Sequence, residues 1–263
     1  MNHLRPAAVA GLFYPAQADA LHQMIEQLLA QNPAQGPVPR GLVVPHAGLV
    51  YSGAVAARGY NLLRQALTTG QPWHRVLLLG PNHRLPLHGM AAPEAELFAT
   101  PIGSMAVDSV GLAELEQRFD VQVRPDVHAM EHCLEVQLPF LLTLVPSLRL
   151  LPLVVGETQP ERVAALIEWA WAQQDVLVIV STDLSHYHAY EDAQRIDGDT
   201  DRLIQSCSPV IEPQQACGAH ALNGLLLATR QQGYQIRCLE MLNSGDTAGG
   251  REQVVGYASY VVY

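Results

Sequence analysis

Short apolar runs alternate along this chain with longer amphipathic stretches, and no other feature limits its fold as strongly. The apolar runs predict buried strands at residues 41–45, 75–80, 149–155, 175–181, 234–242 and 254–263. The amphipathic stretches predict helices at residues 18–31, 53–67, 111–118, 131–145, 160–173, 191–205 and 217–232. Strands that are apolar along their whole length are typical of a sheet covered by helices on both faces. We therefore expect an α/β fold, with a mixed, mostly parallel sheet flanked by helices, in a single domain over residues 1–263.

The ends of these elements carry further signals. Asp19 is a candidate N-cap of the first helix, and Pro160 fits the first turn of the fifth. A loop of Gly, Asp and Thr separates the last two apolar runs, so we expect those two strands to be antiparallel. Residues 32–41 and the Pro-studded residues 84–101 predict loops, and the second is long enough to form a lid or rim.

The charged residues narrow the classes of function. The formal net charge is −10 at pH 7, and all 15 basic residues are Arg. An acidic chain is a poor partner for nucleic acid or for an anionic membrane, so we expect neither. Because Lys is absent, Schiff-base, pyridoxal-phosphate and Walker-lysine chemistry is excluded.

The N-terminus and the cysteines favour a cytoplasmic protein. The apolar stretch in residues 1–15 is short and broken by Gly and Pro, unlike a secretion signal. No run approaches the roughly 18 apolar residues of a membrane-spanning helix. The four cysteines form no CxxC pair, which disfavours a zinc knuckle, and we expect them to be buried, reduced thiols: Cys133, Cys207, Cys217 and Cys238.

Polar residues that can bind a metal or move a proton follow directly after four of the predicted strands. The residues in question are His46, His83, Asp183 with His186, and Asp246. Ligands of open α/β sheets bind beyond the carboxyl ends of the strands. A lone loop histidine is more often solvated than functional. The recurrence of such residues at one topological position, beside Gly, Pro or Ser that allow tight turns, predicts that they converge on one site.

These residue types suit a metal. Two neutral imidazoles and one carboxylate on one face of the ion are typical of Fe(II) oxygen chemistry, and the same set also serves Zn(II) or Mn(II). His46 and His83 fit the imidazoles, and Asp246 or Asp183 fits the carboxylate.

His186 follows Asp183 by three residues, which would place both on one side of a helical turn. There His186 could act as an acid or base beside the metal without binding it. The competing interpretation is that the TDLS sequence only caps a helix, through Asp183 or Ser185. Both interpretations can hold together.

Residues 128–145 carry four polar side chains at helical spacing, namely His128, Glu131, His132 and Glu135. An HxxxH pair can chelate a metal, but the HExxH order of zinc proteases is absent. The alternative is a buried polar network behind the site. We favour support for Glu131 and Glu135, and proximity to the site for His132 as a catalytic candidate. Glu131 and Asn82 are the candidates for orienting a metal-bound histidine.

Cys217 opens the predicted helix over residues 217–232. A helix N-terminus could lower the pKa of its thiol, although structural burial is the simpler interpretation.

Segments spread over nearly the whole chain resemble the Memo family. They are RPAAVAGLFYP, VPHAGLVYSG, LLLGPNHR, HAMEHCLEVQLPFL, VSTDLSHY, ACGAH and NSGDTAGG with VVGYAS. The most specific of them are EHxLEVQLPFL and PHAGxxYSG. Bacterial and archaeal members are often described as protein B of the AmmeMemoRadiSam system. The family fold is similar to that of class III extradiol dioxygenase catalytic subunits, which use non-haem Fe(II).

The resemblance implies roles where the motifs match. It implies that His46 and His83 bind the metal, and that Asp183 and His186 correspond to the family's S-[ST]-D-L-x-H stretch, with His186 as the acid/base. The third ligand departs from the pattern, because a cysteine is expected near the final strand loop of eukaryotic Memo and this chain has Asp246 there. The implied metal is Fe(II), with Zn(II), Cu or Mn(II) as alternatives. The implied partners are a small-molecule or peptide substrate and other AmmeMemoRadiSam proteins.

The sequence is compatible with three functions. The first is a dioxygenase-like redox enzyme with Fe(II) on His46, His83 and Asp246, in which His186 moves a proton. The second is a hydrolase or lyase in which Zn(II) activates water, with Asp183 or His186 as the catalytic base. The third is a non-catalytic module that holds a peptide or a metal in a dioxygenase-like pocket. A fold does not by itself transmit chemistry.

Overall fold

The centre of the protein is a run of four adjacent parallel strands. The computed structural model describes residues 3–263. In spatial order these strands are β2 (Gly41–Val44), β9 (Val176–Ser181), β3 (Arg75–Pro81) and β8 (Arg149–Val155). Nearly all of their side chains are buried, as expected for strands covered on both faces. The expected mixed α/β sheet is confirmed.

Antiparallel strands extend this sheet on both sides. Beyond β2 lies β12 (Val254–Val262), which pairs antiparallel with β2, with β11 (Ile236–Asn243) and with the short β10 (His186–His188). Beyond β8 lie β4 (Met90–Ala92), antiparallel to β8, and β7 (Val121–Val123). A separate three-stranded sheet contains β1 (Leu4–Arg5), β5 (Leu97–Thr100) and β6 (Gly103–Ala106).

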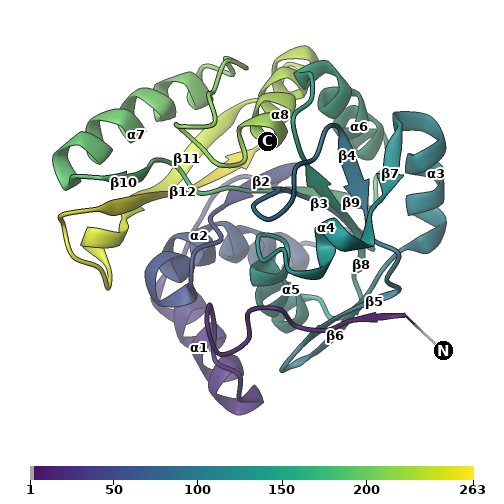
Figure 1. Ribbon diagram of the computed structural model, residues 1–263, viewed down its shortest axis with the longest axis horizontal. Coiled ribbons are helices and arrows are strands. Elements are labelled where there is room, and N and C mark those ends of the chain that lie inside the picture. Colours follow the sequence, from purple (N-terminus) through teal and green to yellow (C-terminus); the bar gives the residue numbers. More distant parts are fainter. Residues whose placement is uncertain (1–2) are drawn as a thin grey trace.

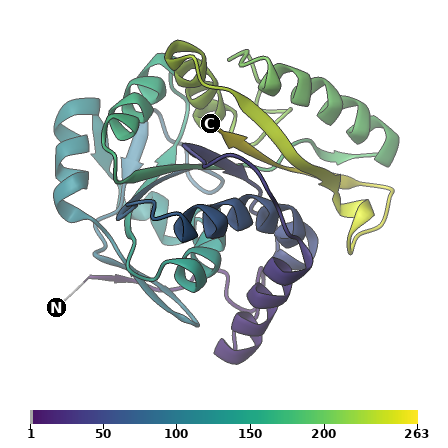
Figure 2. The same cartoon turned by 180° about the vertical axis from the view of Figure 1, so that it is seen from behind.

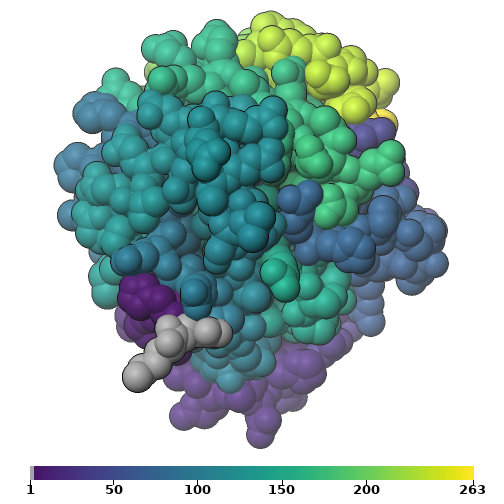
Figure 3. Space-filling model, turned by 90° about the vertical axis from the view of Figure 1, so that its right-hand side faces the viewer, coloured from purple at the N-terminus to yellow at the C-terminus, as the bar shows by residue number. Residues whose placement is uncertain are grey.

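Helices cover both faces of the main sheet (Figures 1 and 2). One layer contains α1 (Ala18–Gln31), α2 (Leu49–Thr68) and α5 (Leu138–Leu144), and the opposite layer contains α3 (Ser109–Phe119), α6 (Pro160–Ala172) and α8 (Ala219–Gln232). Helix α7 (Tyr190–Gln205) packs against β11 and β12, and the short α4 (Pro125–Ala129) lies beside β4. Figure 3 views the side on which α3 lies, where teal segments form most of the surface. None of the helices in residues 3–263 is long and apolar enough to cross a membrane.

Most of the predicted elements are confirmed. All six predicted strands form, and β12 is antiparallel to β11 as expected. The helix predicted over residues 53–67 begins earlier, at Leu49, and Pro160 does occupy the first turn of α6. The N-cap prediction for Asp19 was wrong. Gln17 is the N-cap of α1, and Asp19 lies in the first turn, where its charge favours the positive end of the helix dipole.

Two other expectations were wrong. Residues 131–145 do not form one helix, since a 3₁₀ turn at Glu135–Gln137 precedes α5. The reason is local: the Glu131 carboxylate accepts hydrogen bonds from the backbone N–H groups of His132 and Cys133, and such side-chain contacts compete with helix formation. Residues 84–101 are not all loop either, because they contain β4 and the start of the strand pair β5–β6.

Candidate metal centre

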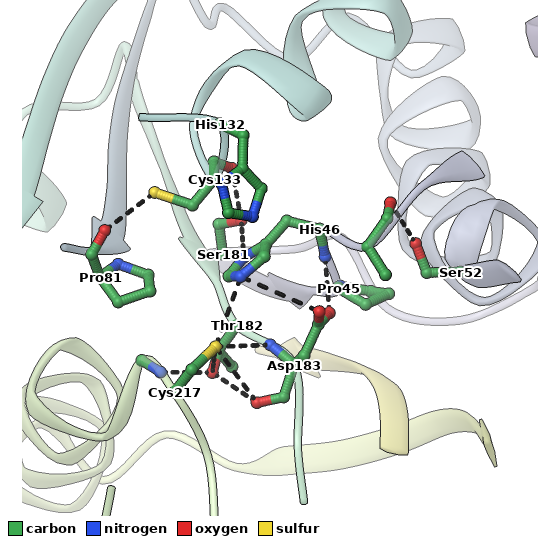
Figure 4. Close-up of polar contacts among 12 residues, drawn as sticks. Pro45, His46, Ser52, Pro81, His132, Cys133, Ser181, Thr182, Asp183 and Cys217 are labelled. Carbon is green, nitrogen blue, oxygen red and sulfur yellow. Dashed lines mark hydrogen bonds and ion pairs between the residues drawn. The ribbon is translucent and has the colours of Figure 1, made fainter. Parts of the chain in front are cut away.

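The site forms where three parallel strands end side by side. Val44 of β2 and Ser181 of β9 are paired in register, so His46 and Asp183, two residues beyond each, become neighbours. The backbone N–H of His46 donates to Oδ1 of Asp183 at 2.8 Å (Figure 4). The adjacent strand β3 leads to His83. The structure therefore brings together residues that are far apart in the sequence, at the edge where α/β proteins bind ligands.

Three imidazoles meet at this edge. The ring centroids of His46 and His83 lie 5.2 Å apart, those of His46 and His132 5.4 Å, and those of His83 and His132 4.6 Å. One ring nitrogen from each of the three lies within 4.8 Å of the other two. His132, which the sequence indicated as a catalytic candidate near the site, stands among the potential ligands.

Hydrogen bonds fix the tautomer of His46. Its Nδ1 lies 2.9 Å from Oγ of Ser181. That hydroxyl donates its only hydrogen to the carbonyl oxygen of Cys133 at 2.8 Å and accepts from Nε2 of Gln137 at 2.9 Å. Ser181 can therefore only accept from His46, so Nδ1 carries the proton. Nε2 therefore carries the lone pair, which faces the site and lies 3.4 Å from Sγ of Cys217.

The Gln137 side chain is itself fixed. Its Nε2 also donates to the carbonyl oxygen of Pro45 at 2.9 Å, and its Oε1 accepts from the Tyr60 hydroxyl at 2.9 Å. These two partners determine which end of the amide is nitrogen. Gln137 and Tyr60 are completely buried, so the chain of bonds that orients His46 begins deep in the core.

Glu131 orients the second imidazole. Its carboxylate accepts from the backbone N–H of His83 at 2.6 Å and from Nδ1 of His83 at 2.9 Å. Burial raises the pKa of Glu131, but its contacts with His83 outweigh burial and lower the pKa to about 2. An ionised carboxylate only accepts, so Nδ1 of His83 is the protonated nitrogen and Nε2 is free. A carboxylate behind a histidine is the usual support of a metal ligand.

The environment keeps the other two imidazoles neutral. Burial lowers the pKa of His46 well below its usual value, and burial lowers that of His132 to about 4. Nδ1 of His132 is buried and has no hydrogen-bond partner, although Oε1 of Glu131 lies 3.3 Å away. Neutral rings and an unpartnered buried nitrogen fit a metal ion, which needs free lone pairs.

A cavity of about 940 Å³ opens onto the cluster, and it is lined by Asp183 and His186 among others. Burial raises the pKa of the Asp183 carboxyl. The expected helical turn from Asp183 to His186 was wrong. His186 lies on β10 instead, beside Tyr187 with φ of 61°, and α7 begins only at Tyr190.

The structure does not bring Asp246 or Asn82 to the histidines. The Asp246 carboxylate accepts from the Tyr190 hydroxyl and from the backbone N–H of Asn243, where it closes a capping box on a 3₁₀ turn. It is exposed and does not line the cavity. The side chain of Asn82 donates to the carbonyl oxygen of Leu85 and not to a histidine.

Sequence reasoning undervalued Cys217. Its Sγ lies 3.4 Å from Nε2 of His46 (Figure 4). Cys217 directly precedes Gly218, the N-cap of α8. Burial raises the pKa of this thiol to about 12, which is opposite to the lowering that a helix N-terminus would cause. The signal that could have identified Cys217 is its place in ACGAH, one of the segments that carry the family resemblance.

A buried salt bridge supports the cluster from behind. Glu135, completely buried, accepts from Arg5 at 2.7 Å, from the backbone N–H groups of Ala8 and Val9, and from the Tyr14 hydroxyl. Arg5 also donates to the carbonyl oxygens of residues 128 and 131. Phe13 of the same N-terminal segment packs against the His132 ring, with the ring centroids 4.6 Å apart and the ring planes tilted by 45°. The first residues of the chain thus hold the segment that carries Glu131 and His132.

The fold is a mixed α/β sheet, and imidazoles converge beyond the ends of its central strands. These features define a class of α/β protein with one polar site at the edge of the sheet. The chain belongs to the Memo-like protein family, whose model matches residues 5–261. It is similar to a MEMO1 family protein of Thermoplasma volcanium, with 33% identity and 98% of each chain covered. A MEMO1 family protein of Thermoplasma acidophilum is 32% identical, again over 98% of each chain.

Among solved structures, the chain is similar to an uncharacterised protein of Escherichia coli K12. The TM-score is 0.47 and the sequence identity is 12%, with 86% of this chain and 100% of the other covered.

Proposed function

We propose that this protein is a metal-dependent redox enzyme of the non-haem iron type that acts on a small molecule. The observation that carries the proposal is the convergence of three imidazole nitrogens within 4.8 Å of one another at the base of a cavity. Fe(II), Zn(II) and Cu are all bound by imidazole. Fe(II) is the metal we propose, because the family resemblance implies it; His46, His83 and His132 would hold the ion beside a cavity that has room for substrate.

The proposed metal ligands are two oriented histidines and two further residues. His46 and His83 form the core, since hydrogen bonds on Nδ1 leave the lone pair of each ring on Nε2. His132 supplies the third imidazole. Cys217 lies close enough to His46 to become a further ligand, and binding would require loss of its proton, which a metal ion promotes.

The residues around the cluster supply the rest of the chemistry. A bound redox-active ion would supply a path for electrons from the substrate to oxygen. His186 lines the cavity and is placed to give or take a proton at its ring. Asp183 holds the backbone of His46 through its Oδ1 and presents its second oxygen 3.9 Å from Nε2 of His46. Asp183 thus positions the first ligand, and it lines the same cavity as His186.

One observation favours a second function. The expected carboxylate ligand Asp246 lies away from the cluster, and three imidazoles beside a thiol suit Zn(II) as well as Fe(II). A zinc ion would make the protein a hydrolase or lyase that activates water. The two functions differ in the metal that supports turnover.

Metal analysis after anaerobic purification tests the proposal. We expect about one equivalent of metal in the wild type and the loss of most of it in His46→Ala, His83→Ala and His132→Ala. His22→Ala, at an exposed position on α1, and Asp246→Ala should keep the wild-type content. Absence of stoichiometric iron, copper, zinc or manganese from the wild type would refute the metal centre. Uptake of oxygen with iron but not with zinc would separate the redox enzyme from the hydrolase.

A further inference from the structure

The outer part of the cavity contains one positive charge. Arg84 lines the cavity directly after His83, and it is the one Arg among the lining residues of the described chain. No ion pair or hydrogen bond of its side chain is found within residues 3–263, whereas most of the other arginines are paired. In a chain of net charge −10 without Lys, this guanidinium lines the cavity with no ion-pair partner among residues 3–263.

The acidic residue of the cavity does not neutralise Arg84. Asp183 is the one carboxylate among the lining residues that the structure describes, and its Oδ1 is already engaged by the backbone N–H of His46. Burial keeps the His46 and His132 imidazoles neutral. Arg84 therefore gives the cavity mouth a local positive potential, which favours an anionic ligand.

Strand β10, which forms part of the cavity wall, has an unusual backbone. Successive side chains of a strand normally point to opposite faces of the sheet. In β10, the register shift against β12 and the positive φ of 61° at Tyr187 break that alternation. As a result His186, Tyr187 and His188 all line the same cavity.

The left-handed conformation costs free energy for a bulky residue such as Tyr. Tyr187 is nevertheless 70% exposed, so its ring gains little from packing that would offset this strain. Phe13 and Tyr51 add further aromatic surface to the lining. The cavity mouth thus presents aromatic faces beside a single guanidinium.

We propose that the outer cavity binds a small aromatic carboxylate, with the carboxylate on Arg84 and the ring against Tyr187. A planar guanidinium matches a planar carboxylate through two parallel hydrogen bonds. A phosphate dianion carries more charge than the one guanidinium of this lining can balance. This assignment rests on the proposed function, because it takes the cavity beside the metal centre to be the substrate cavity.

Two fluorescent probes that differ only in charge test the assignment, namely 2-naphthoate and 2-naphthamide. We use protein stripped of metal with EDTA, so that carboxylate binding to a metal ion does not contribute. We expect 2-naphthoate to bind wild type about tenfold more tightly than 2-naphthamide. Arg84→Gln should remove this difference. Arg64→Gln, an exposed position on α2 away from the cavity, should keep it.

The ring contact has its own variants. Tyr187→Gly should weaken both probes several-fold while it raises the thermal stability, because glycine tolerates the positive φ. Tyr187→Phe should bind both probes as wild type does. Equal binding of the two probes, or no binding of either, would overturn the proposal, and so would an equal loss in Arg64→Gln. Binding of acetate as tight as that of 2-naphthoate would overturn the aromatic part.

The outcomes separate this assignment from the metal centre. Zinc uptake by the same protein samples reports on the histidines alone. Normal zinc uptake with binding of 2-naphthoate that does not depend on Arg84 would refute the carboxylate site only. Arg84-dependent binding in a protein that takes up no metal would support the carboxylate site and refute the metal centre.

Discussion

Oγ of Ser181 accepts a hydrogen bond from Nδ1 of His46 at 2.9 Å, and this contact decides which ring nitrogen of His46 faces the cavity. The geometry follows from the hydroxyl's two other bonds, to Cys133 and from Gln137. A ligand whose tautomer is set in advance does not have to reorganise when a metal arrives.

Ser181→Ala should therefore weaken zinc binding by about 10- to 100-fold, because His46 loses the partner that holds its tautomer. Chelator competition measures this affinity. Ser52→Ala is the matched control: it removes a buried hydroxyl that donates to the carbonyl oxygen of Ala47, in the loop after His46, without touching the imidazole. We expect near wild-type affinity for the control, and equal losses in both variants would contradict the role of Ser181.

Stability should fall in acid through His128. Burial lowers the pKa of this buried histidine from 6.5 to about 4, and its Nε2 donates to the carbonyl oxygen of Ala91 at 2.8 Å. Above pH 6.5 this histidine is neutral in the folded and the unfolded state. As the pH falls from 6.5 to about 4, the unfolded state takes up a proton first, so the folded state loses stability. The loss amounts to about 3 kcal/mol.

Urea unfolding at pH 7 and pH 4 measures this loss in metal-free protein. His128→Gln, which keeps an N–H donor but does not titrate, should lose less free energy of unfolding between the two pH values than wild type. The other buried histidines titrate in both proteins, so the difference isolates His128. Identical pH dependence in the two proteins would contradict the assignment.

Arg5→Ala should strongly destabilise the fold. It leaves the Glu135 carboxylate completely buried without its guanidinium, at a cost of about 3–5 kcal/mol. Arg118→Ala breaks an exposed ion pair with Glu114 on α3 and should cost less than about 1 kcal/mol. Thermal unfolding of both variants checks this ranking, which fails if the two melting temperatures fall equally.

Gly80→Ala should disturb the site through the sheet. A Cβ at this position in β3 would lie 2.6 Å from Sγ of Cys133 and 2.9 Å from a methyl of Leu134. The segment beside His132 would have to shift, at about 1–3 kcal/mol. We expect reduced zinc affinity together with reduced stability. Gly70→Ala, in a turn with open space around it, should cost stability through its positive φ but leave zinc affinity unchanged.

The strands and most helices could be predicted because their patterns are local. An apolar run such as residues 75–80 is buried on both faces of the sheet, and its short length between longer amphipathic stretches identifies it. The same reasoning placed His46 and His83 together, since parallel strands end at one edge of the sheet. The short strands β4 and β10 were missed because three residues carry no period, and their pairing depends on distant partners.

The details of the site depend on contacts that no local pattern encodes. Whether Asp246 or His132 lies beside His46 is decided by how the loops fold back. Asp246 closes a capping box after β11. The Glu131 carboxylate accepts hydrogen bonds from the next two backbone N–H groups, and these bonds turn the chain at His132. Cys217 lies 171 residues from His46 in sequence, so only the fold reveals that their side chains meet.

The Arg5 salt bridge joins residues 130 positions apart, and the contact of Cys217 with His46 spans most of the chain. A ribosome must therefore release about half of the polypeptide before Arg5 and Glu135 can meet, and more than four-fifths before Cys217 and His46 can. Nascent chains would expose histidines and thiols without the arrangement that selects a metal. Metal loading should accordingly follow completion of synthesis, which makes the order of biosynthetic events part of how this centre acquires its ion.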